Sequence, residues 1–248
     1  MVLPVYLAMT GAEMLTAGEK AFPLAWMACH FSPYSDGITN LPAGLPKGSM
    51  LILDDSTPCR GHNPELVAQQ LCNAVRSFDC ESVLLDFQRE PTPESLAMAC
   101  ALVTALPCPT AVSAGYAENE DSPILLPPSP LHIPLATYLK PWNSREIWLE
   151  AALCQEAVTV TEAGTSFKPQ FPPDGLFDGF FDEMLCCNHI IQIQEDHISF
   201  TLFDTADTLA KKLSLASALG VSRFVGLYQE LGNLPHNFYL QQMKEPPV

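Results

Sequence analysis

The stretch Glu81-Ser82-Val83-Leu84-Leu85-Asp86-Phe87-Gln88 is a short apolar run that ends in alternating polar residues. Such a run, closed by Arg89-Glu90-Pro91, is typical of a buried strand followed by a loop. Side chains two residues apart share one face of a strand, so Asp86 and Gln88 point to the same side. The stretch therefore predicts a buried strand that presents a carboxyl group and an amide together at its C-terminal end.

Amphipathic helices are expected on both sides of this strand. Asn63-Pro64-Glu65 supplies a helix N-cap followed by proline at the first helical position, and Thr92-Pro93-Glu94 repeats the arrangement. Apolar residues recur at helical spacing after each of them. Strands that alternate with helices in this way predict a parallel sheet with crossover helices.

The same pattern extends along the whole chain. A further helix contains Leu209 and ends at Gly220, a long loop covers residues 123–134, and a hairpin pairs residues 190–194 with 197–202. The other strands are expected at residues 5–9, 25–31, 50–53, 82–87, 110–113, 133–137, 157–161 and 224–228. We therefore predict one α/β domain over residues 1–248, a (β/α)8 TIM barrel with a small β-hairpin insertion before the last helix and strand.

Composition limits the kinds of partner that this chain can bind. The 248 residues are 48% hydrophobic and carry 28 acidic against 12 basic side chains, for a formal net charge of −16. So acidic a chain is a poor partner for nucleic acid or for an anionic membrane. No basic, apolar leader opens the sequence and no apolar run reaches the roughly 18 residues of a membrane span. We expect a cytoplasmic protein, with its oligomeric state left open.

Candidate functional residues lie at strand ends, because these meet at one mouth of a barrel. Asp54 and Asp55 end the third strand, Asp86 and Gln88 the fourth, and Glu162 a later one. Adjacent residues on a strand face opposite ways, so one of the two aspartates enters the mouth. With His30 and His132 they suggest a metal-assisted hydrolase, but the spacing is not diagnostic. We predict no metal and no cofactor.

The residues also resemble a known family. Residues 81–88 are similar to the fourth-strand signature of glycoside hydrolase family 18, D-x-x-D-x-D-x-E, found in the chitinase and spore-cortex-lytic group. Residues 197–232, with Asp204-Thr205-Ala206-Asp207-Thr208-Leu209 and Lys212-Leu213, resemble that family's closing hairpin, helix and last strand, most closely in its spore-germination branch. Residues 24–40 resemble the second strand and its loop in that branch.

The resemblance implies chemistry on N-acetylglucosamine polymers, in which the acetamido group of the substrate attacks the anomeric carbon. Asp86 matches the residue that orients the acetamido group, whereas Gln88 occupies the position of the general acid. The earlier aspartate positions hold Glu81 and Leu84. An amide cannot donate a proton as a carboxylic acid does, so the resemblance predicts a barrel that binds a carbohydrate ligand without cutting it.

Two other hypotheses stay open. In an active glycosidase, a displaced acid such as Glu90 or Glu162 would replace Gln88; in a scaffold, the barrel would bind no ligand. The resemblance places an aromatic residue at the floor of the sugar site, for which Tyr228 is the candidate. Tyr116 and Tyr138 lie near loops where aromatic faces suit sugar rings, although ordinary packing explains them equally well.

Overall fold

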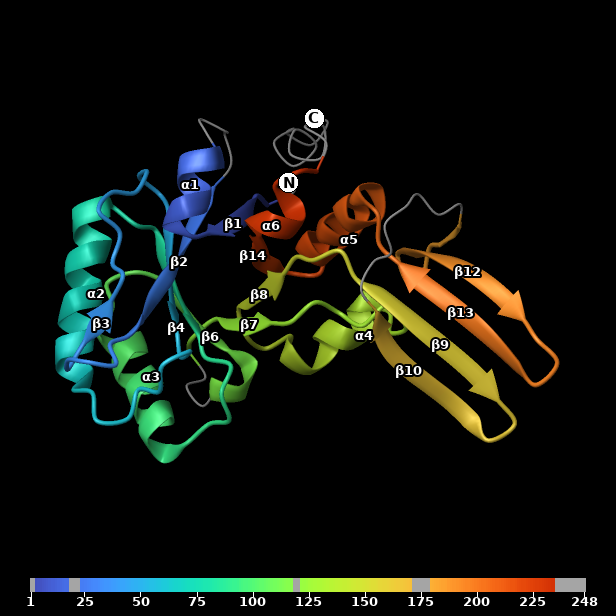
Figure 1. Ribbon diagram of the computed structural model, residues 1–248, viewed down its shortest axis with the longest axis horizontal. Helices are drawn as coiled ribbons and strands as arrows, with labels where there is room; N and C mark the ends of the chain where they lie inside the picture. The colour runs from blue at the N-terminus through green and yellow to red at the C-terminus, as the bar shows by residue number, and fades with distance from the viewer. Residues whose placement is uncertain (1–2, 18–22, 118–120, 171–178, 235–248) are drawn as a thin grey trace.

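Eight parallel strands close into a barrel in a computed structural model that describes residues 3–17, 23–117, 121–170 and 179–234 (Figure 1). The order around the sheet is β1-β14-β8-β7-β6-β5-β4-β2, and β1 pairs with both β14 and β2, which closes the ring. The (β/α)8 barrel expected from the sequence is confirmed. Its strands are β1 (Val5–Met9), β2 (Leu24–Phe31), β4 (Met50–Asp54), β5 (Ser82–Asp86), β6 (Thr110–Ser113), β7 (Ile124–Leu126), β8 (Ile147–Glu150) and β14 (Val221–Leu227).

The helices cover the outside of this ring. In α2 (Pro64–Phe78) the Asn63 side chain accepts a hydrogen bond from the backbone N–H of Glu65, and in α3 (Pro93–Ala105) Thr92 and Ser95 form a reciprocal capping box. Both N-caps lie where the sequence predicts them. The remaining elements are α1 (Gly11–Ala17), the two-residue β3 (Ile38–Thr39), α4 (Leu135–Leu139), α5 (Ala206–Ala218), α6 (Tyr228–Leu231) and the short 3-10 turns 114–116 and 140–142.

Side chains fill the barrel interior. Tyr6, Met50, Leu84 and Trp148 belong to the inner apolar cluster, which is separate from the larger cluster between the strands and the helices. Below this layer, at the N-terminal ends of the strands, the Tyr6 hydroxyl and the Arg223 guanidinium both donate to the Glu81 carboxylate. These contacts lie at the N-terminal end of the barrel interior, opposite the end at which the sites of such barrels usually open.

Two barrel strands in the second half lie elsewhere than the sequence predicts. The sixth and seventh strands are β7 and β8, within and after the proline-rich stretch that we expected to be a loop. The expected strand at residues 133–137 is wrong, because this segment leads into α4. Pro134 has no N–H for a strand ladder but suits the start of a helix. The expected strand at 224–228 ends one residue early, and Tyr228 begins α6.

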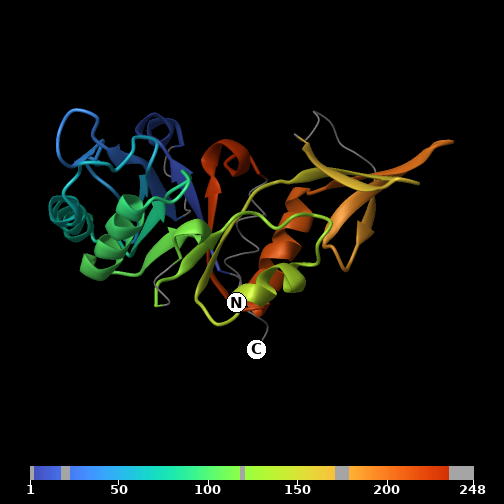
Figure 2. The same ribbon diagram turned by 90° about the horizontal axis from the view of Figure 1, so that it is seen from below.

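The insertion is larger than the expected hairpin. Between β8 and α5 the chain forms a five-stranded antiparallel sheet in the order β10-β9-β13-β12-β11. Its strands are β9 (Gln155–Thr161), β10 (Gly164–Gln170), β11 (Phe180–Asp182), β12 (Cys187–Ile193) and β13 (His197–Phe203). The hairpin is confirmed as β12 and β13, whereas the expected barrel strand at 157–161 belongs to β9. Figures 1 and 2 show this sheet extending away from the barrel.

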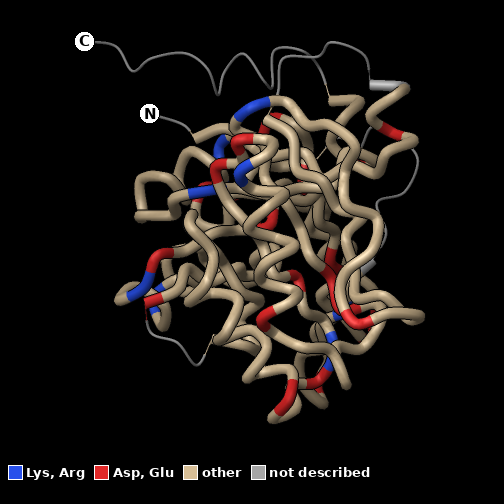
Figure 3. The backbone as a smooth tube through the Cα atoms, turned by 90° about the vertical axis from the view of Figure 1, so that its left-hand side faces the viewer, with Lys and Arg blue, Asp and Glu red and all other residues tan. Residues whose placement is uncertain are grey.

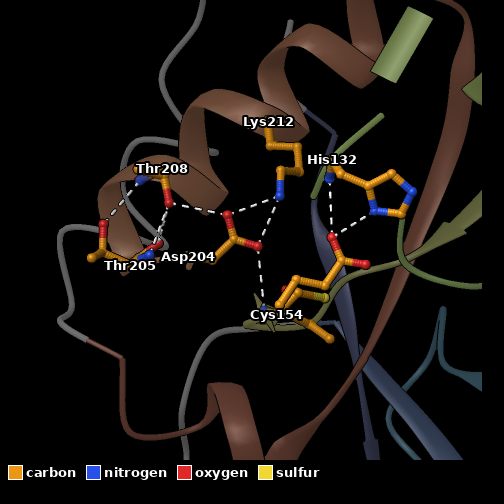
Figure 4. A network of polar contacts seen from close by, with 8 residues as sticks. His132, Cys154, Asp204, Thr205, Thr208 and Lys212 are labelled. Atoms are coloured by element: carbon orange, nitrogen blue, oxygen red, sulfur yellow. Dashed lines mark hydrogen bonds and ion pairs between the residues drawn. The ribbon is translucent and has the colours of Figure 1, made fainter. Parts of the chain in front are cut away.

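A buried ion pair fastens this inserted sheet to the barrel (Figure 4). Lys212 of α5 donates to both carboxylate oxygens of Asp204 at 2.8 Å. Asp204 follows β13, and its carboxylate also accepts from the backbone N–H of Cys154, just before β9, at 3.3 Å and from the Thr208 hydroxyl at 3.2 Å. One carboxylate thus joins the two points where the chain leaves and re-enters the barrel.

Acidic positions are spread along the chain, as the red segments in Figure 3 show. Within the described ranges, none of the helices combines the length and the apolar character that a bilayer crossing requires.

Candidate functional site

A pocket of about 100 Å³ opens at the C-terminal ends of the barrel strands. Its floor is apolar and includes Ile52, Leu84, Leu125 and Val225, whereas its polar groups all lie at the rim. These rim residues are Asp54, Asp86, Gln88 and Glu150. Since side chains at this end of a barrel are the usual carriers of function, we take this mouth pocket as the candidate site.

The fourth barrel strand, β5, supplies two of the rim residues. Leu84, Asp86 and Gln88 alternate along the chain and all line the mouth pocket. The Gln88 amide nitrogen donates to Asp86 Oδ1, and the Ser113 hydroxyl donates to the same oxygen at 3.4 Å. Burial raises the pKa of Asp86, and these two donors act against that rise. Asp86 is therefore a desolvated carboxyl group whose charged form is hydrogen-bonded.

Asp55 has a different role from its neighbour Asp54. It is 5% exposed and lies outside the mouth pocket, where its carboxylate accepts from the backbone N–H groups of Gln88 at 2.8 Å and Arg89 at 3.1 Å. The Arg89 side chain in turn donates to the backbone oxygens of Asp55 and Ser56, both at 2.7 Å. This exchange fixes the loop after β5 and with it the backbone position of Gln88.

Glu150 is the rim residue that our sequence analysis missed. It ends β8 two residues after Trp148, which fills the barrel interior, so both side chains point inward. Burial, the charge of Asp86 and then that of Glu230 raise the pKa of Glu150 to about 7. The signal was present, because Ile147-Trp148-Leu149-Glu150 is an apolar run closed by a carboxylate, like the end of β5.

Replacing Glu150 with glutamine is expected to change the pH dependence of stability. The folded pKa, about 7, lies above the ordinary value of 4.5, so the folded state holds the proton more tightly. The contribution of Glu150 to stability therefore falls as the pH rises from 4.5 to 7. Because E150Q removes this loss, it should be more stable than the wild type by about 1–3 kcal/mol at high pH and nearly equal to it in acid.

Urea unfolding at several pH values measures this difference. The exposed Glu90 provides the matched control, since E90Q removes the same charge without removing a buried one. If the free energies of unfolding of E150Q and the wild type differ by the same amount in acid and in base, the raised pKa of Glu150 is contradicted.

The other candidate residues lie outside the mouth pocket. Glu90 and Tyr116 line a separate pocket of about 380 Å³ beside the start of α3. The Tyr138 hydroxyl donates to the backbone oxygen of Pro127 at 2.9 Å, and Tyr228 packs against the outer apolar cluster rather than the barrel interior. Glu162 lies in the exposed turn between β9 and β10, so its expected position at a barrel strand end is wrong.

Comparisons with known proteins support the fold. No protein-family model matches the chain, and no curated protein sequence matches it. Among solved structures, the chitinase-like agglutinin from Robinia pseudoacacia superposes with a TM-score of 0.58 at 10% identity, covering 95% of this chain and 97% of that one. The family 18 N-acetylglucosaminidase from Paenibacillus barengoltzii gives 0.56 at 9% identity, covering 96% and 98%.

The spore cortex-lytic enzyme SleL from Bacillus cereus gives a TM-score of 0.54 at 9% identity, covering 97% of this chain and 74% of that one. This chain therefore has the (β/α)8 barrel fold of glycoside hydrolase family 18 and chitinase-like proteins. At these identities the likeness concerns the fold, and the function has to be argued from the mouth pocket.

Proposed function

We propose that the mouth pocket binds an N-acetylglucosamine-containing glycan, of the chitin or peptidoglycan type, without hydrolysing it. The observation that carries this proposal is the pair formed by Asp86 and Gln88 in the pocket. The fold neighbours of this chain include chitinases, an N-acetylglucosaminidase and a chitinase-like agglutinin, which makes an amino-sugar polymer the first ligand to test.

Each member of the pair has a distinct role in the proposal. The Asp86 carboxylate accepts hydrogen bonds at the base of the rim, where it would receive the N–H of an acetamido group. Gln88 holds that carboxylate in place through its amide nitrogen. A glutamine amide is too weak an acid to protonate a leaving glycosidic oxygen. Loss of a general acid lowers the rate by about 10²–10⁴-fold.

Calorimetric titration with N-acetylglucosamine oligomers tests the binding. We expect the wild-type protein to bind them and Asp86→Asn to weaken binding by about tenfold or more, the loss of roughly one charge-assisted hydrogen bond. The control is Glu162→Gln, which removes one carboxylate in the distant β9–β10 turn. Failure to bind any oligomer of chitin or peptidoglycan type, or equal affinities of the two variants, would contradict the proposal.

One observation favours a second function, an active glycosidase with a displaced acid. Neither Glu90 nor Glu162 lines the mouth pocket, but Glu150 does, and its pKa of about 7 lets it hold a proton near neutral pH. Hydrolysis by the wild type that is lost in E150Q and kept in E90Q would establish this function. A barrel that gives no thermal shift with any saccharide would instead be a scaffold without a ligand.

A further inference from the structure

The inserted sheet has one polar and one apolar face. In β12, Ile191 and Ile193 point to one side and Gln192 to the other. Across the strands, Ile193 lies opposite Ile198, and Ile198 opposite Val160. The next row on the same side joins Ile191, Phe200, Val158 and Phe167. The opposite side carries polar side chains, among them Thr159, Ser166, Gln192 and Ser199.

Among the described residues, those that cover the apolar face lie at its base. There Val158 and Leu202 are buried against Leu131, from the segment after β7, and His132 stacks on Phe167 with 4.0 Å between ring centroids. Towards the turns the face is open to solvent, with Ile193 79% exposed. We call the exposed residues on this side the apolar sheet face: Val160, Phe167, Ile191, Ile193 and Ile198 in the two outer rows, and Phe180 at the edge of the next row, opposite His189.

The size of the apolar sheet face is close to what a stable protein contact needs. With about 150–200 Å² for each fully exposed side chain, the exposed fractions correspond to roughly 500–650 Å² of apolar surface. The largest apolar patch of an ordinary monomer reaches about 300–600 Å², and a standard interface buries about 800 Å² per partner. The apolar sheet face thus supplies most of the area of one side of an interface.

Charge favours a second copy of this chain as the partner. The two outer rows contain no charged side chain, although the chain as a whole carries a net charge of −16. The open part also lies towards the end of the sheet that points away from the barrel (Figures 1 and 2). Two copies joined here keep their barrels well apart, so most of their like charges lie beyond the screening length of about 8 Å.

We propose that the apolar sheet face is a homodimer interface, in which the inserted sheets of two copies pack face to face. Flat sheets of β-branched and aromatic side chains pack in this way in β-sandwiches, about 10 Å apart and nearly aligned. A twofold axis through the contact brings the same residues of both copies together, so the patch has only to complement itself.

Sedimentation velocity of the full chain tests the dimer. We expect the average mass to rise from 27.1 kDa towards twice that value as the concentration increases to about 100 µM. Ile193→Asp, in a side chain that is 79% exposed, should weaken the dimer by at least about tenfold while leaving the melting temperature of the monomer unchanged.

Two further variants separate the apolar contact from general charge effects. Gln192→Asp adds the same charge on the neighbouring residue of the polar face and should leave the dimer intact. Ile193→Lys adds the opposite charge on the apolar sheet face and should dissociate the dimer as Ile193→Asp does. The proposal is overturned if the wild type stays at 27.1 kDa throughout, if Gln192→Asp dissociates the dimer equally, or if Ile193→Lys does not dissociate it. Capture of lipid vesicles by a monomeric wild type would likewise overturn it and assign the face to a membrane.

Discussion

Replacing Lys212 with methionine is expected to lower the free energy of unfolding by about 3–5 kcal/mol. The Lys212 side chain is 8% exposed and that of Asp204 is fully buried, so the variant leaves a carboxylate in the interior without its cation. Methionine is unbranched and only one atom shorter than lysine, so most of the effect comes from the lost ammonium group. Because Asp204 also receives the backbone N–H of Cys154, the loss falls where the inserted sheet meets the barrel.

Lys211 is the matched control for this change. Its ammonium group lies 4.0 Å from the centroid of the Phe181 ring in an exposed position. Lys211→Met should cost no more than about 1 kcal/mol. The double variant Lys212→Met/Asp204→Asn removes both charges and should recover part of the stability lost in Lys212→Met. Equal unfolding midpoints in urea for Lys211→Met and Lys212→Met would contradict a buried, paired charge.

The first half of the barrel could be predicted because local signals agree there. Short, largely apolar strands alternate with helices there, and the two long helices each begin with a capping residue followed by a proline, at Asn63 and Thr92. Alternation along β5 also placed Asp86 and Gln88 on one side, and both line the mouth pocket. It also separated Asp54, in the pocket, from the buried Asp55.

The second half could not be predicted from local signals alone. The sixth barrel strand, β7, has three residues within a proline-rich segment, too few to show a period. In sequence, strand β9 resembles a barrel strand because about half of its side chains are apolar. In the structure its two neighbours are antiparallel: Thr161 pairs with residues 3 and 36 positions further along the chain. Because the sequence predicts a barrel strand there, it wrongly places Glu162 at the barrel mouth and misses Glu150.

In the C-terminal part of the chain, the residues that resemble glycoside hydrolase family 18 have structural roles. Thr205 and Thr208 form a reciprocal capping box at the start of α5. Asp204, just before this box, pairs with Lys212 of the same helix. These residues hold the inserted sheet and α5 in place, and none of them lines the mouth pocket. Likeness in this segment therefore supports the fold, whereas the proposed function is argued from a few rim residues.

If the proposed function holds, Gln88→Glu is expected to hydrolyse N-acetylglucosamine oligomers faster than the wild type. The Gln88 amide already touches Asp86 Oδ1, so a glutamate there would place two carboxyl groups at hydrogen-bond distance. Two such groups cannot both ionise easily, and one proton is shared between them with a raised pKa. A carboxyl group that keeps its proton near neutral pH is what a general acid requires, and the gain should be about 10²–10⁴-fold over the wild-type rate.

The structure favours this variant because the backbone of residue 88 is already fixed. Its N–H donates to Asp55 at 2.8 Å, an interaction that does not depend on the side chain. Glu90→Gln, outside the mouth pocket, serves as the control: added to Gln88→Glu, it should leave the hydrolysis rate of that variant unchanged.

The most direct test of a glycan-binding barrel disabled at Gln88 is hydrolysis of fluorogenic N-acetylglucosamine oligomers by the wild type and Gln88→Glu side by side. We predict release of the fluorophore by Gln88→Glu and none above background by the wild type. Turnover by the wild type would contradict the account and direct attention to Glu150, and silence of both proteins would show that the mouth pocket does not present such a glycan to residue 88.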